Sequence, residues 1–167
     1  MQGSNPLYVS PSVDGKHLYV AQVGQWMNEQ GAPALDGVLE RFSLEGRRFE
    51  GVILREENLG GNLGSFAMID AASGVVIRTG ASFRTELVRF DALQGKVVSR
   101  WAASECTGGV SCFSFVQVAK TPKGGVLLLD RYEKRPGVRL FEPIEGREQT
   151  EVPLDIGLPP EFVVFAP

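Results

Sequence analysis

The chain has 167 residues and a formal net charge of −3, which comes from 17 Lys and Arg residues against 20 Asp and Glu residues. This length suits a single domain, and an apolar content of 43% is enough to build a core. The charge balance excludes the basic surface that nucleic-acid binding requires, and no apolar run reaches the roughly 20 residues that a transmembrane helix needs.

The first third of the chain alternates short β-forming stretches with turn residues. Asp14-Gly15 is a turn signal between the first two stretches, and Glu45-Gly46 is a turn signal between the next two. Four strands joined in succession predict one antiparallel meander. The predicted strands are residues 7–10, 17–23, 38–44 and 48–54.

The same plan occurs twice more along the chain. Phe42 recurs as Phe90 and Phe141, at separations of 48 (90 − 42) and 51 (141 − 90) residues, and a glycine turn follows each of them. A period near 50 residues predicts a stacked or radial β architecture. The second unit has predicted strands at 66–70, 75–78, 86–90 and 96–101, and the third unit has them at 113–119, 126–129, 138–141 and 148–152.

The end of the chain resembles its beginning, because residues 163–167 are similar to residues 7–11. We therefore expect residues 161–167 to begin a further unit. The predicted fold class is all-β, with β-propeller blades built as three four-stranded antiparallel meanders plus one extra strand. The predicted blades are approximately residues 6–55, 64–104 and 112–155, within a single β-propeller segment that spans 1–167.

The first strand–turn–strand unit also carries a family resemblance. Residues 10–20 read S-P-S-V-D-G-K-H-L-Y-V, and this pattern resembles the signature of bacterial β-propellers of the YVTN and gluconolactonase-like kind. The resemblance covers little more than this stretch, and it is specific to the propeller class rather than to an activity. For the gluconolactonase-like members it implies a metal-dependent hydrolase, whose metal is held by acidic and amide side chains in the channel.

Three blades and one strand do not close a ring, because propellers close with about four to eight blades. The open flank of such an array would be a large apolar patch. We therefore expect the chain to be a piece of a larger propeller, or two copies to complete a six-bladed ring as a homodimer. An open three-repeat solenoid is the alternative, although its terminal repeats should carry polar caps that this sequence lacks.

The two cysteines, Cys106 and Cys112, stand in a loop of small residues that includes two glycines. Such a loop can close into a disulfide, which would indicate an oxidising compartment and therefore a periplasmic or secreted protein. Two unpaired thiols are the alternative, and they would leave a cytoplasmic location open. The N-terminus has no signal-peptide pattern, so we expect a signal peptide to be absent or already removed.

The connections between the predicted strands alternate between tight turns and long loops. In a meander, the connections from the second to the third strand and from the fourth strand to the next blade emerge on one face, here called the long-loop face. Binding residues concentrate on loops held by a rigid scaffold, so this face is the expected site. The long loops are residues 24–37, 55–65, 79–85, 102–112, 130–137 and 153–161.

Three groups of residues on this face are candidate contacts for a ligand or partner. An aromatic ring beside a methionine would anchor a partner, or the ring packs back onto its own blade. Carboxylate and amide oxygens would ligate Ca²⁺, or they are solvated loop groups that match no EF-hand spacing. A mixed-charge run would grip an anionic ligand, or it is an ordinary charged hairpin loop. The three groups are Trp26 and Met27, then Glu57, Asn58 and Asn62, and then Arg131 and Tyr132.

The sequence shows no catalytic constellation, since His17 is its single histidine and no serine stands in a nucleophile-elbow context. We therefore expect a non-catalytic binding or scaffold module, whose long-loop face holds a protein partner or ligand, without a cofactor apart from the candidate Ca²⁺. Its partners would be another protein or the remaining blades of the propeller. The alternative is part of a metal-dependent hydrolase of the lactonase or esterase kind, with missing ligands on further blades.

Overall fold

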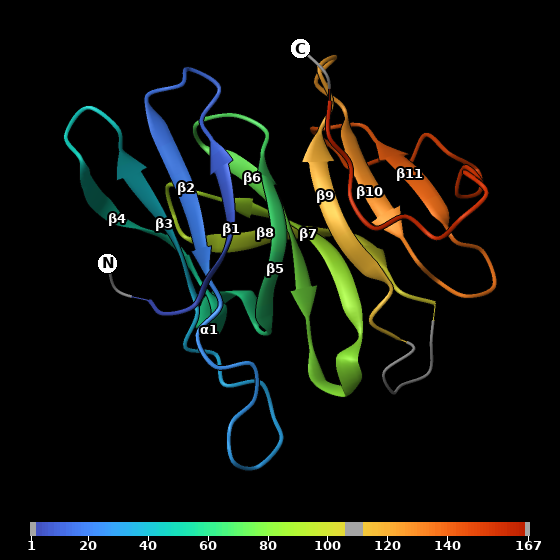
Figure 1. Ribbon diagram of the computed structural model, residues 1–167, viewed down its shortest axis with the longest axis horizontal. Coiled ribbons are helices and arrows are strands. Elements are labelled where there is room, and N and C mark those ends of the chain that lie inside the picture. The colour runs from blue at the N-terminus through green and yellow to red at the C-terminus, as the bar shows by residue number, and fades with distance from the viewer. Residues whose placement is uncertain (1–2, 106–111, 166–167) are drawn as a thin grey trace.

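The computed structural model describes residues 3–105 and 112–165 and shows an all-β protein of three twisted antiparallel sheets (Figure 1). Each sheet follows the chain without crossovers, so each is one blade, and the predicted meander is confirmed for the first two blades. No helix in the described part of the chain is long and apolar enough to cross a membrane.

The blades follow one another along the chain, and two short helical turns lie in their connections. Blade 1 contains β1 (Pro6–Pro11), β2 (His17–Gln22), β3 (Val38–Ser43) and β4 (Arg48–Arg55), and α1 (Glu56–Leu59) follows it. Blade 2 contains β5 (Asn62–Met68), β6 (Ser73–Thr79), the 3₁₀ turn η1 (Ala81–Phe83), β7 (Thr85–Asp91) and β8 (Lys96–Ala103). Blade 3 contains β9 (Phe115–Lys120), β10 (Val126–Asp130) and β11 (Gly137–Phe141).

The glycine turns between the third and fourth chain segments of blades 2 and 3 share a physical cause. In blade 2, the Asp91 carboxylate accepts hydrogen bonds from the backbone N–H groups of Leu93 and Gln94. The Glu142 carboxylate accepts equivalent bonds from residues 144 and 145 in blade 3. Gly95 and Gly146 then adopt positive φ angles of 63° and 71°, which glycine reaches at low cost.

The blades pack face to face through two separate apolar clusters. One cluster lies between blades 1 and 2 and buries Phe90 completely, and the other lies between blades 2 and 3 and buries Phe141 completely. Leu39 faces blade 2, so the regular alternation of β3 directs Phe42 to the opposite face of blade 1. Phe90 and Phe141 therefore point toward the preceding blade, and Phe42 occupies the corresponding face of blade 1.

The two ends of the array are open. On blade 1, the face turned away from blade 2 carries the half-buried ring of Phe42, which contacts Phe49 edge-on at 5.1 Å, and the exposed side chains of Leu7 and Val9. Beyond blade 3, the C-terminal segment exposes large apolar side chains, including Phe162 and Val164. An array with two uncovered apolar ends agrees with the expected incomplete ring.

The predicted fourth strand of blade 3, residues 148–152, does not form a regular strand. Two isolated bridges join this region to β11, one between Phe141 and Glu148 and the other between Val138 and Leu154. Six residue steps on one side (154 − 148) therefore face three on the other (141 − 138), which a regular ladder cannot accommodate. The Glu148 side chain instead turns back to bind Arg139.

The predicted start of a further blade, residues 161–167, shows no strand within its described part, 161–165. The Gln117 side chain of β9 instead binds the backbone of Val163, accepting from its N–H at 2.6 Å and donating to its C=O at 3.4 Å. The described residues supply no neighbouring strand that would complete a ladder here. The Gln117 amide thus satisfies one backbone N–H group and one backbone carbonyl of this segment.

Substitution of the three repeated phenylalanines tests this packing. Phe90→Ala and Phe141→Ala should each lower the free energy of unfolding by about 3–5 kcal/mol, because each leaves a cavity between two blades. Phe42→Ala should cost clearly less in the isolated chain, since no further blade covers that ring. Denaturant unfolding at low protein concentration measures all three, and an equal loss for Phe42→Ala would show that its face is also covered in solution.

Candidate functional site

The long connections gather at one end of the array. The first strands of the blades, β1, β5 and β9, are neighbours, and the 24–37 loop, α1 and η1 all lie at the lower end of the view in Figure 1. This arrangement agrees with the long-loop face expected from the meander.

Trp26 links all three blades at this face. Its carbonyl accepts a hydrogen bond of 2.6 Å from Nδ2 of Asn62, the first residue of β5. Its ring meets Phe113, two residues before β9, in an edge-on contact with centroids 5.9 Å apart. The Trp26 ring therefore contacts the segment that precedes blade 3.

The 24–37 loop is held in a fixed shape by its own polar side chains. The Asn28 Oδ1 atom accepts from the backbone N–H groups of Gln30 and Ala32, which closes the tip of the loop. At its base, the Asp36 carboxylate accepts from the Gln25 N–H at 2.9 Å. Met27, at the start of this tip, remains 40% exposed.

A pocket of about 130 Å³ lies between the 24–37 loop and the η1 turn. Among the sequence candidates, Trp26, Met27 and Asn62 line it together. The sequence analysis placed the opposite wall, residues 79–83, in one of the long loops but singled out none of its residues, because its backbone shape, rather than its composition, makes the pocket. The further lining residues are Gly31, Ala32, Pro33, Thr79, Gly80, Ala81, Ser82 and Phe83.

Glu56 is the carboxylate built into this end of the array. It is fully buried, and it accepts hydrogen bonds from the backbone N–H groups of Gly37 at 2.9 Å and Leu63 at 2.6 Å. Burial raises the pKa of this carboxyl, although both hydrogen bonds act in the opposite direction. Glu56 therefore joins the start of β3 to the start of β5 and serves the scaffold.

The three residues expected to offer oxygen ligands do not converge. Glu57 is exposed on α1, and Asn58 donates at 2.8 Å to the carbonyl of Gly95, in the β7–β8 turn. Asn62 is buried beside Trp26. Within residues 3–105 and 112–165, no group of three or more His, Cys, Asp or Glu side chains could hold a metal ion. A Ca²⁺ site on this face stays a prediction.

Arg131 and Tyr132 lie apart from the pocket, in the connection between β10 and β11. Arg131 forms an exposed ion pair with Glu161 at 3.3 Å, and its backbone N–H donates to the Ser114 carbonyl at 2.8 Å. The backbone N–H of Tyr132 donates to the Asp130 carboxylate at 2.9 Å. These two residues therefore border a polar network rather than an open binding surface.

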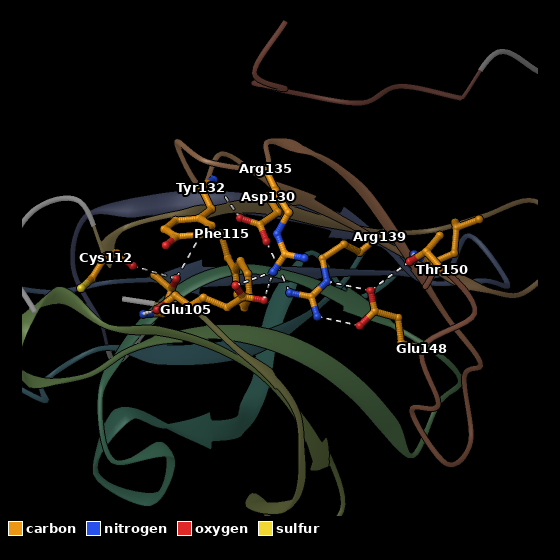
Figure 2. A network of polar contacts seen from close by, with 12 residues as sticks. Glu105, Cys112, Phe115, Asp130, Tyr132, Arg135, Arg139, Glu148 and Thr150 are labelled. Carbon is orange, nitrogen blue, oxygen red and sulfur yellow. Dashed lines mark hydrogen bonds and ion pairs between the residues drawn. The ribbon is translucent and has the colours of Figure 1, made fainter. Parts of the chain in front are cut away.

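That network is centred on Arg139 and is shown in Figure 2. Its guanidinium binds the Glu148 carboxylate through two hydrogen bonds of 2.9 and 2.6 Å and reaches Asp130 at 3.4 Å. It also lies 5.6 Å from the ring centroids of both Phe115 and Phe141. Burial acts to raise the pKa of Glu148, but Arg139 outweighs it, so the pKa is lowered. Burial raises the pKa of Asp130 despite the same cation.

Blade 2 carries a comparable network in which Glu86 pairs with Arg78 and with Arg100. Burial acts to raise the pKa of Glu86, and the two guanidinium groups reverse this and lower it. Register places Arg78, Gln22 and Asp130 at matching positions near the ends of the second strands. Each blade therefore has a polar group at one equivalent place, which faces the preceding blade in blades 2 and 3 and the open end of the array in blade 1.

The lowered pKa of Glu86 predicts a pH dependence of stability. Its contribution should be complete above the pKa of an unfolded glutamate, about 4.3, and should be lost as the pH falls through the lower folded value. The difference in unfolding free energy between wild type and Glu86→Gln should therefore shrink at acidic pH. Denaturant unfolding at several pH values measures this difference. Glu105→Gln, which breaks a half-exposed pair with Arg135, is the control and should change little at any pH.

The chain was compared with protein-family models and with curated proteins, and neither comparison gave a match. Solved structures do resemble it. TolB from Acinetobacter baumannii aligns with a TM-score of 0.56 at 15% identity, over 85% of this chain and 31% of that one. A gluconolactonase from Xanthomonas campestris aligns with a TM-score of 0.54 at 14% identity, over 90% of this chain and 48% of that one.

A nidogen/laminin complex aligns with a TM-score of 0.51 at 15% identity, over 87% of this chain and 46% of that chain. The chain thus spans about a third to a half of the structures that it resembles. At these identities the likeness shows the fold alone. The expected resemblance to β-propellers, including gluconolactonase structures, is confirmed for the fold.

Proposed function

We propose that the protein is a β-propeller binding module whose long-loop face holds a protein partner. The observation that carries this proposal is the position of Trp26, which bonds to the start of β5 and packs against Phe113 ahead of β9. This anchoring makes the 24–37 loop a rigid feature of the scaffold, and it leaves Met27 exposed beside a pocket. Rigid loops with aromatic and methionine side chains are typical of protein-binding surfaces.

The alternative function is that of a metal-dependent hydrolase of the lactonase or esterase kind. It would require carboxylate and amide ligands that converge in the channel, and the described residues do not bring Glu57, Asn58 and Asn62 together. Those ligands would have to come from residues beyond the described ones. The binding module needs no such addition, so we favour it.

We further propose that the two apolar ends of the array pack against further propeller blades. The exposed Leu7 and Val9 at one end, and Phe162 and Val164 at the other, are surfaces of the kind that a neighbouring blade would cover. A second copy of this chain would supply such blades and give a six-bladed two-fold assembly. The remaining blades of a longer polypeptide would supply them equally well.

Site-specific photo-crosslinking tests the long-loop face. Met27 is replaced by p-benzoylphenylalanine, and the protein is irradiated in native extract and analysed by mass spectrometry. We expect one protein to crosslink at this position and the yield to fall at least tenfold when Trp26→Ala is added, because that change releases the loop. Heat denaturation monitored by circular dichroism should show that this variant stays folded.

The matched control carries the same crosslinker at Val13, which is 75% exposed in the β1–β2 turn on the opposite face. Equal crosslinking of one protein from Val13 and from Met27 would contradict the proposal. Calorimetric titration with Ca²⁺ and an assay of lactone hydrolysis distinguish the binding module from the hydrolase. Stoichiometric Ca²⁺ binding together with hydrolysis of a lactone would favour the hydrolase.

Light scattering over a concentration series tests completion of the ring. A second copy predicts a mass of twice the 18.1 kDa chain, and Val9→Asp should shift this species to the monomer by placing a charge in the interface. A monomer at all concentrations would rule out the second copy. Leu93→Asp, at an exposed position in the β7–β8 turn, is the control and should not alter the mass.

A disulfide between Cys106 and Cys112 and a periplasmic or secreted location remain part of the proposal. Cys112 is fully buried, and Cys106 lies outside the described residues. Alkylation without a reducing agent, followed by mass spectrometry, should modify neither cysteine if the bond forms. Modification of both cysteines in the denatured protein would contradict it.

A further inference from the structure

Two residues that line the pocket between the 24–37 loop and η1 have buried side-chain oxygens without a hydrogen-bond partner among the described residues. Asn62 and Thr79 stand directly opposite each other in the β5–β6 ladder, and each is only 2% exposed. Neither the Oδ1 atom of Asn62 nor the Oγ1 atom of Thr79 has a hydrogen-bond partner among the described residues. Buried polar atoms nearly always have a partner, so two neighbouring exceptions in one pocket wall require an explanation.

The hydrogen bond to Trp26 defines the chemistry of this pair. The Nδ2 atom of Asn62 donates to the Trp26 carbonyl, which turns Oδ1 into the free acceptor. The Thr79 hydroxyl can both donate and accept. A group that donates one hydrogen bond and accepts another would therefore satisfy both residues at once. A hydroxyl is the smallest group that does so.

The η1 side of the pocket is a strained turn. Ser82 and Phe83 both have positive φ angles, of 60° and 61°, in the left-handed region that non-glycine residues rarely occupy. The turn is closed by a single backbone bond from the Gly80 N–H to the Arg84 carbonyl at 2.9 Å. Water reaches neither oxygen in the present conformation. Because this turn lines the same pocket as Asn62 and Thr79, we infer that an outward movement of the turn gives a ligand access to both oxygens.

The remaining walls of the pocket are largely apolar and include Trp26, Pro33 and Phe83. The volume of about 130 Å³ is close to that of an apolar cavity of roughly 150 Å³ that binds benzene. The pocket thus has room for one six-membered ring, with aromatic side chains to pack against it. A ring that carries one hydroxyl fits both the volume and the unpaired oxygens.

We propose that this pocket binds the phenol side chain of a tyrosine presented by the protein partner. The ring lies against Trp26 and Phe83, while its hydroxyl donates to Asn62 and accepts from Thr79 as the η1 turn moves outward. This inference rests on the proposed function, because it identifies the anchor residue of the partner on the long-loop face.

The test uses 4-methylphenol as the probe and toluene as its counterpart without the hydroxyl. Both are titrated into ¹⁵N-labelled protein, and amide shifts are followed by NMR. We expect 4-methylphenol to bind about five- to tenfold more tightly than toluene, since only its hydroxyl satisfies the two oxygens. The shifts should centre on Gly80 and Ser82 in the moving turn.

The variant Thr79→Val keeps the shape of the side chain and removes its hydroxyl. It should lose most of the preference for 4-methylphenol while toluene binding stays unchanged. Thr121→Val, in the β9–β10 turn outside this pocket, is the matched control and should keep the preference. If Thr79→Val does not fold, the ratio of the two affinities measured on the wild-type protein still tests the proposal.

Equal affinities for the two compounds, or shifts centred elsewhere, would overturn the proposal. The crosslinking experiment separates this failure from failure of the proposed function. A partner that still crosslinks from position 27 in the Thr79→Val variant with undiminished yield would leave the long-loop face as the binding surface. It would show that the pocket does not hold the anchor.

Discussion

Burial of apolar surface between successive blades holds this protein together, and the third strand of each blade supplies the central ring. Phe90 and Phe141 are completely buried between two sheets, whereas the equivalent Phe42 lies on an open face. Blades 2 and 3 therefore each depend on the preceding blade for the burial of this ring. The same requirement leaves an unfinished surface at each end, which explains why a three-blade array calls for further blades.

The inter-blade contacts also position the candidate site. Packing brings the starts of β5 and β9 close enough for Trp26 to contact both, through Asn62 and through Phe113. A loop of blade 1 can then be held by the two following blades, so its shape reports the assembly of all three. The buried Glu56 reinforces this arrangement by joining Gly37 to Leu63. The contacts that position the candidate site are thus also contacts that hold the fold together.

Periodic features of the fold could be predicted from the sequence, and irregular ones could not. The recurrence of Phe42, Phe90 and Phe141 reflects burial that each blade repeats, so spacing alone revealed the blades. The polar stretch near Glu148 looked like a strand, because the sequence does not show that its carboxylate turns back to Arg139. The wall around Ser82 depends on backbone angles that no residue pattern signals.

The polar groups on the faces between blades have a further consequence for how the chain assembles. Gln22, Arg78 and Asp130 occupy the same place in three similar sheets, yet they differ in charge and in hydrogen-bonding capacity. Their partners lie within the same blade in each case: Gln22 donates to Glu40, Arg78 pairs with Glu86, and Asp130 pairs with Arg139. A blade therefore carries its charged group into a junction already paired with an opposite charge on its own sheet. Docking of one blade on the next then avoids the cost of about 3–5 kcal/mol that an unpaired buried charge would bring.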